Sequence, residues 1–361
     1  MLNLQVLIAA DKSKYDMAKE HATFEAELLA TCLSHYDLGI IKGIRRFPAG
    51  SRRAPKVIIK SEKGTFLFKR RAHGRDLQAK VAFTHQLQLH LAAQNFPLPH
   101  LVGTRDTNNS MLVLDDQVYE MFEYIQGKGY DSSLDATFNS GRILGLYHKL
   151  LANFTSDYNP PTGSYHNAPA IRQAIGKTVS SLPIDSRPSG EELPTTVKRI
   201  EDVYLSSAQK VQEIGLGGWP KQIVHGDWHP GNMLFRDRHV VAVIDYDAAR
   251  VQQRVIDFAN GVLQFSILGG GEDPTKWPAY VDMTRFKRFM LGYDSVNVIT
   301  KQEMQCVPHL MCEAMIAEGV LPIAATGSFG RIKGYPFLKM IEQKINWIQD
   351  NISALTAVLD D

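Results

Sequence analysis

The sequence predicts an α+β fold of two lobes, in which a small antiparallel β-sheet lobe precedes a larger, mostly helical lobe. Short β-prone runs are confined to the stretch before residue 126, whereas helical patterns dominate after the glycines at positions 127 and 129. The length of 361 residues also exceeds what one hydrophobic core usually supports. We therefore expect a first lobe at residues 1–125 and a second at residues 126–361.

The first lobe is predicted to contain few strands and one prominent helix. Apolar positions recur at helical spacing over residues 15–34. Two β-prone runs at 56–60 and 65–69 flank the turn Glu62-Lys63-Gly64, which predicts a hairpin. A helix is expected at 76–94, followed by strands at 111–114 and 117–125. These elements suffice for one small sheet covered by one helix.

The second lobe is predicted to be helical, with loops marked by proline and glycine. The expected helical segments are 138–151, a broken stretch over 168–214, 278–292, 301–318 and 337–358.

Composition excludes several classes of protein. The 40 basic and 38 acidic side chains nearly balance, so no global field favours nucleic acid. No apolar run reaches the roughly 18 residues of a membrane span, so we expect no membrane partner. Three cysteines without a CxxC pair predict free thiols in a reducing compartment, which favours a cytoplasmic protein. The sequence carries no information on oligomeric state.

The strongest chemical signal is the segment 223–247, which reads IVHGDWHPGNMLF from residue 223 and VVAVIDYD from residue 240. Its two apolar runs flank a polar turn at 236–239 and predict a second hairpin. A hairpin centred on that turn places Asn232 opposite Val243, with Asp245 as the diagonal neighbour on the same face. An amide oxygen and a carboxylate placed this way suit Mg2+, which prefers oxygen ligands.

Asp227 precedes Asn232 by five positions in the loop that leads into this hairpin. Protein kinases have the same interval in their catalytic loop, where the Asp accepts the substrate hydroxyl proton and the Asn holds metal. A later Asp holds the metal that bridges the phosphates, and Asp245 stands in that place.

Together, HGDWHPGN and IDYD resemble the signature of the aminoglycoside phosphotransferase and choline kinase-like family. This family of small-molecule kinases includes homoserine kinase type II-like and spore-coat-type members and has a bilobal protein-kinase-like fold. The resemblance implies that Asp227 is the catalytic base and that Asn232 and Asp245 are the magnesium ligands. It also implies structural support of the catalytic loop by three residues, His225, His229 and Asp257. The alternative is an Asp-rich hairpin that only satisfies polar turns.

The amino-terminal half fits this resemblance in order. Lys69, at the end of the predicted strand 65–69, is expected to reach the α- and β-phosphates of ATP. Gly50 and Ser51 lie in the expected phosphate-covering loop, where small residues allow close backbone approach. The segment 119–127 resembles the family's hinge, which implies that the backbones of Glu123 and Ile125 meet adenine.

The sequence departs from the family pattern at one position that matters. Many members carry a Glu on the helix of the first lobe, paired with the strand lysine, but residues 81–90 contain no acidic side chain. Asp76 lies at the start of that helix and could replace the Glu only with an unusual helix orientation. The partner of Lys69 is therefore open.

The resemblance predicts an ATP- and Mg2+-dependent phosphotransferase that moves the γ-phosphate to a hydroxyl of a small metabolite. The helices between residues 161 and 220 and the last hundred residues would bind a homoserine-, amino sugar- or choline-like acceptor. Candidate carboxylates for a cationic acceptor are Glu272, Asp273 and Asp282, and candidate arginines for a carboxylate-bearing one are Arg250, Arg254 and Arg331. Because no dense acidic block follows Asp257, a homoserine-type or other small hydroxylated acceptor is favoured. A Ser/Thr protein kinase of the spore-coat type and a nucleotide-binding pseudokinase remain the alternatives.

Overall fold

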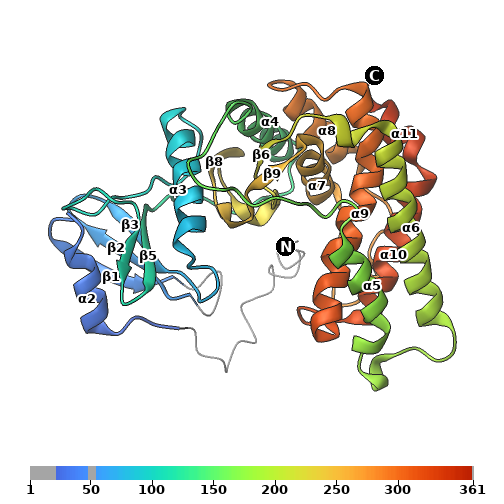
Figure 1. The fold of residues 1–361 in the computed structure, drawn as a ribbon, viewed down its shortest axis with the longest axis horizontal. Helices are drawn as coiled ribbons and strands as arrows, with labels where there is room; N and C mark the ends of the chain where they lie inside the picture. The colour runs from blue at the N-terminus through green and yellow to red at the C-terminus, as the bar shows by residue number, and fades with distance from the viewer. Residues whose placement is uncertain (1–21, 48–53, 360–361) are drawn as a thin grey trace.

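The computed structural model describes residues 22–47 and 54–359, which form two lobes (Figure 1). The elements of the first lobe are α2 (Ala26–Ser34), β1 (Ile41–Arg46), β2 (Lys56–Ser61), β3 (Thr65–Arg70), α3 (Gln78–Ala93), β4 (Leu112–Leu114) and β5 (Gln117–Glu123). Its five strands form one antiparallel sheet in the order β1-β2-β3-β5-β4. Helix α3 lies between this sheet and the second lobe (Figure 1).

The register of the first sheet places charged residues beside one another. Lys69 of β3 is the cross-strand partner of Lys56 on β2 and of Glu120 on β5. Alternation along β3 keeps Phe68 on the opposite face, where it is fully buried against Tyr119 with ring centroids 5.8 Å apart. One face of the sheet is therefore a small apolar core, and the other presents Lys69.

The second lobe is mostly helical. Its helices are α4 (Leu134–Leu150), α5 (Pro169–Ser181), α6 (Glu192–Ile214), α7 (Arg254–Ser266), α8 (Met283–Asp294), α9 (Lys301–Thr326), α10 (Gly334–Asp350) and α11 (Ile352–Thr356). Short strands form three two-stranded sheets. In the first, β6 (Gln222–Val224) pairs with β9 (Arg250–Gln252), and in the second, β7 (Met233–Arg236) pairs with β8 (His239–Val243). In the third, β10 (Ser328–Phe329) pairs with β11 (Ile332–Lys333). This composition confirms the predicted α+β class.

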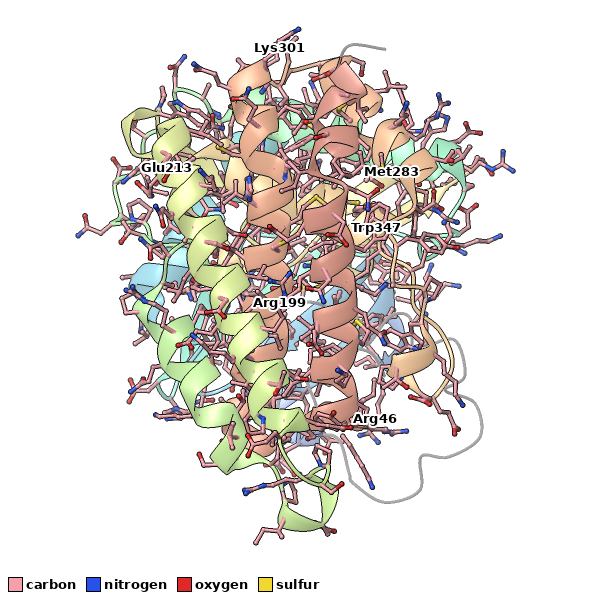
Figure 2. All side chains as sticks on the ribbon, turned by 90° about the vertical axis from the view of Figure 1, so that its right-hand side faces the viewer. Arg46, Arg199, Glu213, Met283, Lys301 and Trp347 are labelled. Carbon is pink, nitrogen blue, oxygen red and sulfur yellow. The ribbon has the colours of Figure 1, made fainter. Side chains whose placement is uncertain are left out.

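Helices pack closely on two sides of the second lobe. A Cβ at Gly141 of α4 would lie 1.9 Å from the Phe289 carbonyl oxygen of α8, so these helices require glycine where they meet. On the other side, Figure 2 shows α6, which carries Arg199 and Glu213, beside α9 and α10. These helices, with α5, form the carboxyl-terminal bundle.

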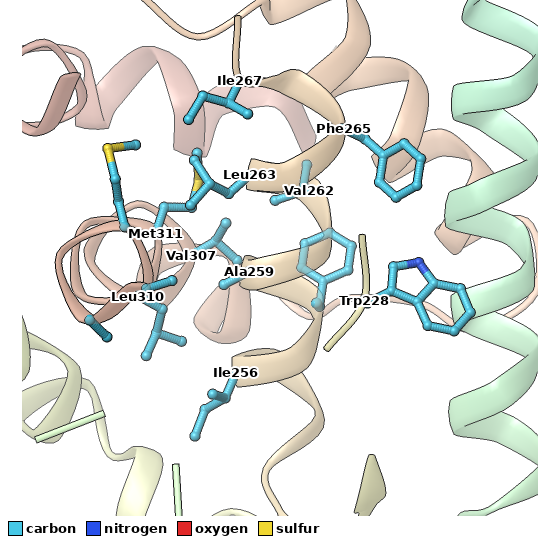
Figure 3. Packing of buried hydrophobic residues seen from close by; sticks show 14 of the residues in the cluster. Trp228, Ile256, Ala259, Val262, Leu263, Phe265, Ile267, Val307, Leu310 and Met311 are labelled. Carbon is cyan, nitrogen blue, oxygen red and sulfur yellow. The ribbon is translucent and has the colours of Figure 1, made fainter. Parts of the chain in front are cut away.

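Helix α9 crosses the core of this lobe. It is long and apolar enough to pass for a membrane span, but 78% of the residues in its most apolar window are buried inside the protein. Val307, Leu310 and Met311 pack against α7, and Trp228 from the loop before β7 lies on the other side of α7 (Figure 3). The apolar character of α9 is thus that of a core helix.

The structure adds one helix to the predicted ones and changes the extent of others. Helix α7 was not among the predicted elements, although its polar residues, from Arg254 through Asp257 to Gln264, recur at helical spacing. Helix α9 continues to Thr326, beyond the predicted end at residue 318, although Pro322 lies within it. The predicted helix at 337–358 is divided near Asn351 into α10 and α11. The three cysteines are free, as expected, and the structure shows that they are buried.

Candidate active site

The loop after β6 is held by one buried carboxylate. Asp257, in the first turn of α7, accepts hydrogen bonds from the backbone N–H groups of His225 and Gly226, both at 2.9 Å. Its Oδ2 also lies 3.1 Å from Nε2 of His148 on α4. Because Asp257 is 1% exposed, these contacts satisfy a charge that would otherwise be costly to bury. Asp257 therefore holds the backbone of this loop in place.

Gly226 is required by the geometry of the loop. Its φ is +74°, in the left-handed region, and a Cβ there would lie 2.5 Å from the Ala248 carbonyl oxygen. The loop before Asp227 thus packs directly on the turn that follows β8.

His225 has surroundings that suit a structural side chain. Its ring is fully buried, 5.3 Å from each of the rings of Trp228 and Tyr246. Burial lowers the pKa of His225, so the ring is neutral at physiological pH.

Asp227 and Asn232 are joined by hydrogen bonds. The Asn232 amide nitrogen donates to the Asp227 carbonyl oxygen at 3.0 Å and to its carboxylate at 3.1 Å. Both amide hydrogens are therefore used, which leaves the Asn232 Oδ1 directed away from Asp227.

His229 lies on the other side of the Asp227 carboxylate. The Gly231 N–H donates to Nδ1 of His229, and Nε2 of the same ring lies 3.5 Å from Asp227 Oδ2. Since Nδ1 accepts a hydrogen bond, the proton of the neutral ring is on Nε2 and faces the carboxylate. Burial by itself would raise the pKa of Asp227, but the contact with His229 holds it below its ordinary value. Asp227 is accordingly ionised at neutral pH.

The register of the β7–β8 hairpin differs from the predicted one by one residue. A bulge shifts the pairing beyond Phe235, so Val243 pairs with Met233 rather than with Asn232. The Ile244 N–H continues the ladder to the Asn232 carbonyl oxygen at 2.9 Å. Asp245 follows at φ +64°, a left-handed conformation that turns the chain at the end of β8. The hairpin still brings Asn232 and the Asp245 backbone to the same end.

The oxygen groups at this end fit a hard divalent cation. Asn232 contributes its free amide oxygen, and Asp245 is an exposed carboxylate. Within residues 22–47 and 54–359 no cluster of three or more His, Cys, Asp or Glu side chains could hold a metal. Mg2+ needs no such cluster, because it is usually bound through one or two carboxylates, water and substrate phosphates.

In the first lobe, Lys69 has an acidic partner that the sequence did not reveal. Its Nζ lies 3.0 Å from the carboxylate of Glu120 on β5, whose side chain is fully buried. Nε2 of His85 on α3 contacts the other Glu120 oxygen at 2.6 Å, at the helix where the family usually has its Glu. The missing helix carboxylate is thus replaced by a strand carboxylate, and Asp76 is not the partner.

Arg71 extends this group of charges to the second lobe. Its Nε and Nη2 donate to the two Glu120 oxygens at 2.8 and 2.9 Å, and its Nη1 donates to Asp247 at 2.8 Å. Burial alone would raise the pKa of Glu120, but these cationic neighbours hold it well below its usual value. Asp247 lies two residues after Asp245, so the chain of contacts runs from Lys69 to the end of β8.

Lys56 is a second cation that faces the same region. Burial lowers its pKa, and repulsion from Lys69 on the neighbouring strand lowers it further. The negative charges of Asp245 and Asp247 act in the opposite direction and raise the pKa of Lys56. The Lys56 ammonium is thus close enough to both carboxylates to be attracted by them.

Besides Lys69, the predicted nucleotide-binding residues are Gly50, Ser51, Glu123 and Ile125. Gly50 and Ser51 lie outside the described residues. The Glu123 N–H donates to the His100 carbonyl oxygen at 2.9 Å, so the predicted adenine contact would fall to its carbonyl group. Ile125 follows β5 in an irregular segment, and the Phe122 ring lies 5.0 Å from Lys69 Nζ.

Most of the predicted acceptor-binding charges have structural partners. The carboxylates of Asp273 and Asp282 accept backbone N–H groups at the starts of a 3₁₀ turn and of α8. Arg254 is paired with Glu303 at 2.8 Å. Arg250 also has a structural partner, because its Nε donates to the Ala248 carbonyl oxygen at 2.8 Å, beside the loop after β6.

Four residues of this site were missed by sequence reasoning, namely Lys56, Arg71, His85 and Glu120. A signal existed for one of them, because the turn at 62–64 fixes the hairpin register and so pairs Lys56 with Lys69. For Glu120 no local signal existed, since its contact with Lys69 joins strands about fifty positions apart in the chain.

The sequence matches the profile of the phosphotransferase enzyme family (APH) over residues 43–287. A homoserine kinase of Zymomonas mobilis subsp. mobilis is 24% identical over 194 residues, covering 54% of this chain and 55% of the relative. The chain thus spans about half the length of the curated relative it matches.

Solved structures show the same fold. A microcompartment-associated aminopropanol kinase superposes with a TM-score of 0.65 at 15% identity, covering 92% of this chain and 99% of the other. An amicoumacin kinase, solved with AMP-PNP, Ca2+ and Ami, gives a TM-score of 0.62 at 12% identity, covering 91% and 94%. The predicted bilobal, protein-kinase-like fold is confirmed. Because the family profile matches more than half of the sequence, the chain belongs to the phosphotransferase enzyme family.

Proposed function

We propose that this protein is an ATP- and Mg2+-dependent kinase that phosphorylates a hydroxyl group of a small metabolite. The observation that carries the proposal is the Asp227–Asn232 pair, hydrogen-bonded at the end of a hairpin that continues into Asp245. Phosphoryl transfer depends mostly on positioning and charge neutralisation, and this set of groups supplies both.

Asn232 and Asp245 would hold Mg2+ through the amide oxygen and the carboxylate. When bound, the ion neutralises charge on the phosphates of ATP. Lys69 would contact the α- and β-phosphates, with Glu120 holding its ammonium in place. The backbones of Glu123 and Ile125 would contact adenine.

Asp227 would act on the acceptor. It takes the proton of the acceptor hydroxyl as that oxygen forms a bond to the γ-phosphorus. The bond from this phosphorus to the β–γ bridging oxygen breaks, and ADP leaves with the electron pair. Before transfer, the Nε2 proton of His229 interacts with the Asp227 carboxylate and helps to orient it. Asp257 holds the loop through the N–H groups of His225 and Gly226.

The acceptor class that we favour is a small amino alcohol. The relatives are named for homoserine and aminopropanol, each of which carries an amine and a hydroxyl group. The sequence favours a homoserine-type or other small hydroxylated acceptor, because no dense acidic block follows Asp257. The helices α5, α6, α9 and α10 would enclose it.

Magnesium-dependent nucleotide binding gives the first test. At a concentration of ATP 100 times its Kd, binding should stabilise the fold by about 2.7 kcal/mol and raise Tm by several degrees. Asp245→Ala should abolish the part of this shift that requires Mg2+, because it removes one of the two protein ligands. Asp116→Ala is the matched control, since Asp116 is also an exposed Asp at positive φ but lies far along the chain. A full Mg2+-dependent shift in Asp245→Ala would reject Asp245 as a ligand.

The acceptor is tested by ATP consumption with a panel of hydroxylated amines and amino acids, including homoserine and aminopropanol. A casein-like protein serves as the competing substrate. Turnover with a small amino alcohol supports the proposal. Turnover with the protein alone would establish a protein kinase instead, and nucleotide binding without any turnover a pseudokinase.

A further inference from the structure

We propose that Arg71 is a positioning residue that sets the metal-binding end of β8 relative to Lys69. It does so by joining Glu120 of the first lobe to Asp247 of the second. This inference rests on the proposed function, because it assigns Lys69 to phosphate and Asp245 to metal.

The guanidinium of Arg71 has little freedom. Its side chain is 6% exposed, and its three nitrogen atoms all donate within the protein. Nε and Nη2 form a two-pronged contact with Glu120, whereas Nη1 donates to Asp247 and to the Arg75 carbonyl oxygen at 3.1 Å. Because the guanidinium is planar and rigid, the contact of its Nε and Nη2 with Glu120 also fixes the position of Nη1, which donates to Asp247.

The first-lobe end of this connection is built into the sheet. Glu120 is the register partner of Lys69 on the neighbouring strand, and their side chains are 3.0 Å apart. Helix α3 adds only His85, whose other ring nitrogen is 2.9 Å from Ser110 Oγ. The carboxylate that holds Lys69 is therefore positioned mainly by the sheet, with His85 of α3 as an additional partner.

The second-lobe end lies beside the proposed metal ligand. Asp247 is in the 3₁₀ turn 246–248, which begins directly after Asp245. Its side chain is 24% exposed and pairs with Arg71. A displacement of Asp247 moves the start of this turn and with it the Asp245 backbone, whose left-handed conformation leaves few alternatives. The distance between Lys69 and Asp245 thus depends on Arg71.

Lys56 offers a competing explanation. Its ammonium is attracted by Asp245 and Asp247. In this explanation Asp247 affects nucleotide binding through its charge alone and not by positioning the turn. Asp247 could also approach the metal directly. Both explanations differ from ours in one respect, because neither requires Arg71.

A double-mutant cycle separates these explanations. The four proteins are the wild type, Asp247→Asn, Arg71→Lys and the double variant. We measure the Kd of ADP by calorimetry at fixed Mg2+, and the Mg2+ concentration that gives half-maximal binding. Each single variant should weaken ADP binding about tenfold and raise the half-saturating Mg2+ concentration. The double variant should be no weaker than either single one, because both changes break the same connection.

Controls exclude a general loss of structure. Asp247→Asn alters only a partly exposed side chain, so this variant without nucleotide should retain its Tm. Arg71→Lys keeps a cation beside Glu120 but loses the two-pronged contact, so its Tm should fall while the protein still folds. Asp247→Glu retains the carboxylate and should bind ADP more tightly than Asp247→Asn. Asp135→Asn removes another carboxylate that contacts arginines, Arg238 and Arg288, and should leave ADP binding unchanged. If Arg71→Lys does not fold, the contrast between Asp247→Asn and Asp247→Glu decides.

Two results would overturn the inference. One is unchanged ADP and Mg2+ affinity in Asp247→Asn. The other is a multiplicative loss in the double variant, which would show that Asp247 acts without Arg71. If the wild type itself binds no nucleotide, the proposed function fails and the inference falls with it. Wild-type binding combined with either adverse result removes only the role of Arg71.

Discussion

Asp227→Asn is expected to lower kcat by about 10²- to 10⁴-fold, which is the contribution of a well-placed general base. Asparagine keeps the shape of the side chain and can still accept the hydrogen bond from Asn232. It cannot take a proton from the acceptor hydroxyl. Because the nucleotide contacts lie elsewhere in the proposed site, the Kd of ADP with Mg2+ should stay near the wild-type value.

The measurement is steady-state turnover with the acceptor identified by the screen, together with calorimetric ADP binding. Asp237→Asn is the control, because Asp237 lies at positive φ in the β7–β8 turn, where asparagine is well tolerated. Turnover of Asp227→Asn within a few-fold of the wild type would reject Asp227 as the base. Loss of ADP binding along with turnover would show that the loop had been displaced instead.

Asp257→Ala should produce the largest loss of stability, about 3–5 kcal/mol in the free energy of unfolding. Asp257 and His148 form a pair in which both side chains are fully buried. Removing the carboxylate also leaves the N–H groups of His225 and Gly226 without their acceptor. Each buried group left unpaired costs about 1–3 kcal/mol. The loss is measured by urea unfolding at neutral pH.

Two comparisons make this result specific. Asp257→Asn keeps an oxygen acceptor and should lose less stability than the alanine variant. Asp185→Ala, at an exposed position before α6, should change the free energy of unfolding by less than about 0.5 kcal/mol. A loss below about 1 kcal/mol for Asp257→Ala would mean that water replaces the carboxylate, and that the loop does not depend on it.

The parts of the site that were predictable are those encoded locally. The spacing from Asp227 to Asn232 and the apolar runs on both sides of the 236–239 turn describe a loop and hairpin within one short segment. Lys69 was predictable because the hairpin that carries it has a recognisable turn. In these cases the residues that define the element are neighbours in the chain.

The parts that were not predictable depend on long-range packing. Glu120 meets Lys69 only because β5 pairs with β3, and no pattern near either residue specifies that pairing. Arg71 and Asp247 are 176 positions apart. The bulge that shifts the β7–β8 register is a local deviation from ideal pairing, which counting residues from the turn cannot detect. Helix α7 is different, because a local signal existed and was missed: Asp257, Asn260 and Gln264 recur at helical spacing.

A crystal structure with Mn2+ in place of Mg2+ and with AMP-PNP measures the arrangement of the oxygen groups directly. We predict one anomalous peak beside the phosphates, with Asn232 Oδ1 and an Asp245 carboxylate oxygen at about 2.1 Å, the distance expected for such an ion. The Asp227 carboxylate should face the γ-phosphate across a space that an acceptor hydroxyl can fill. A peak bound by other side chains, or nucleotide away from Lys69, would contradict the assignment of this site to phosphoryl transfer.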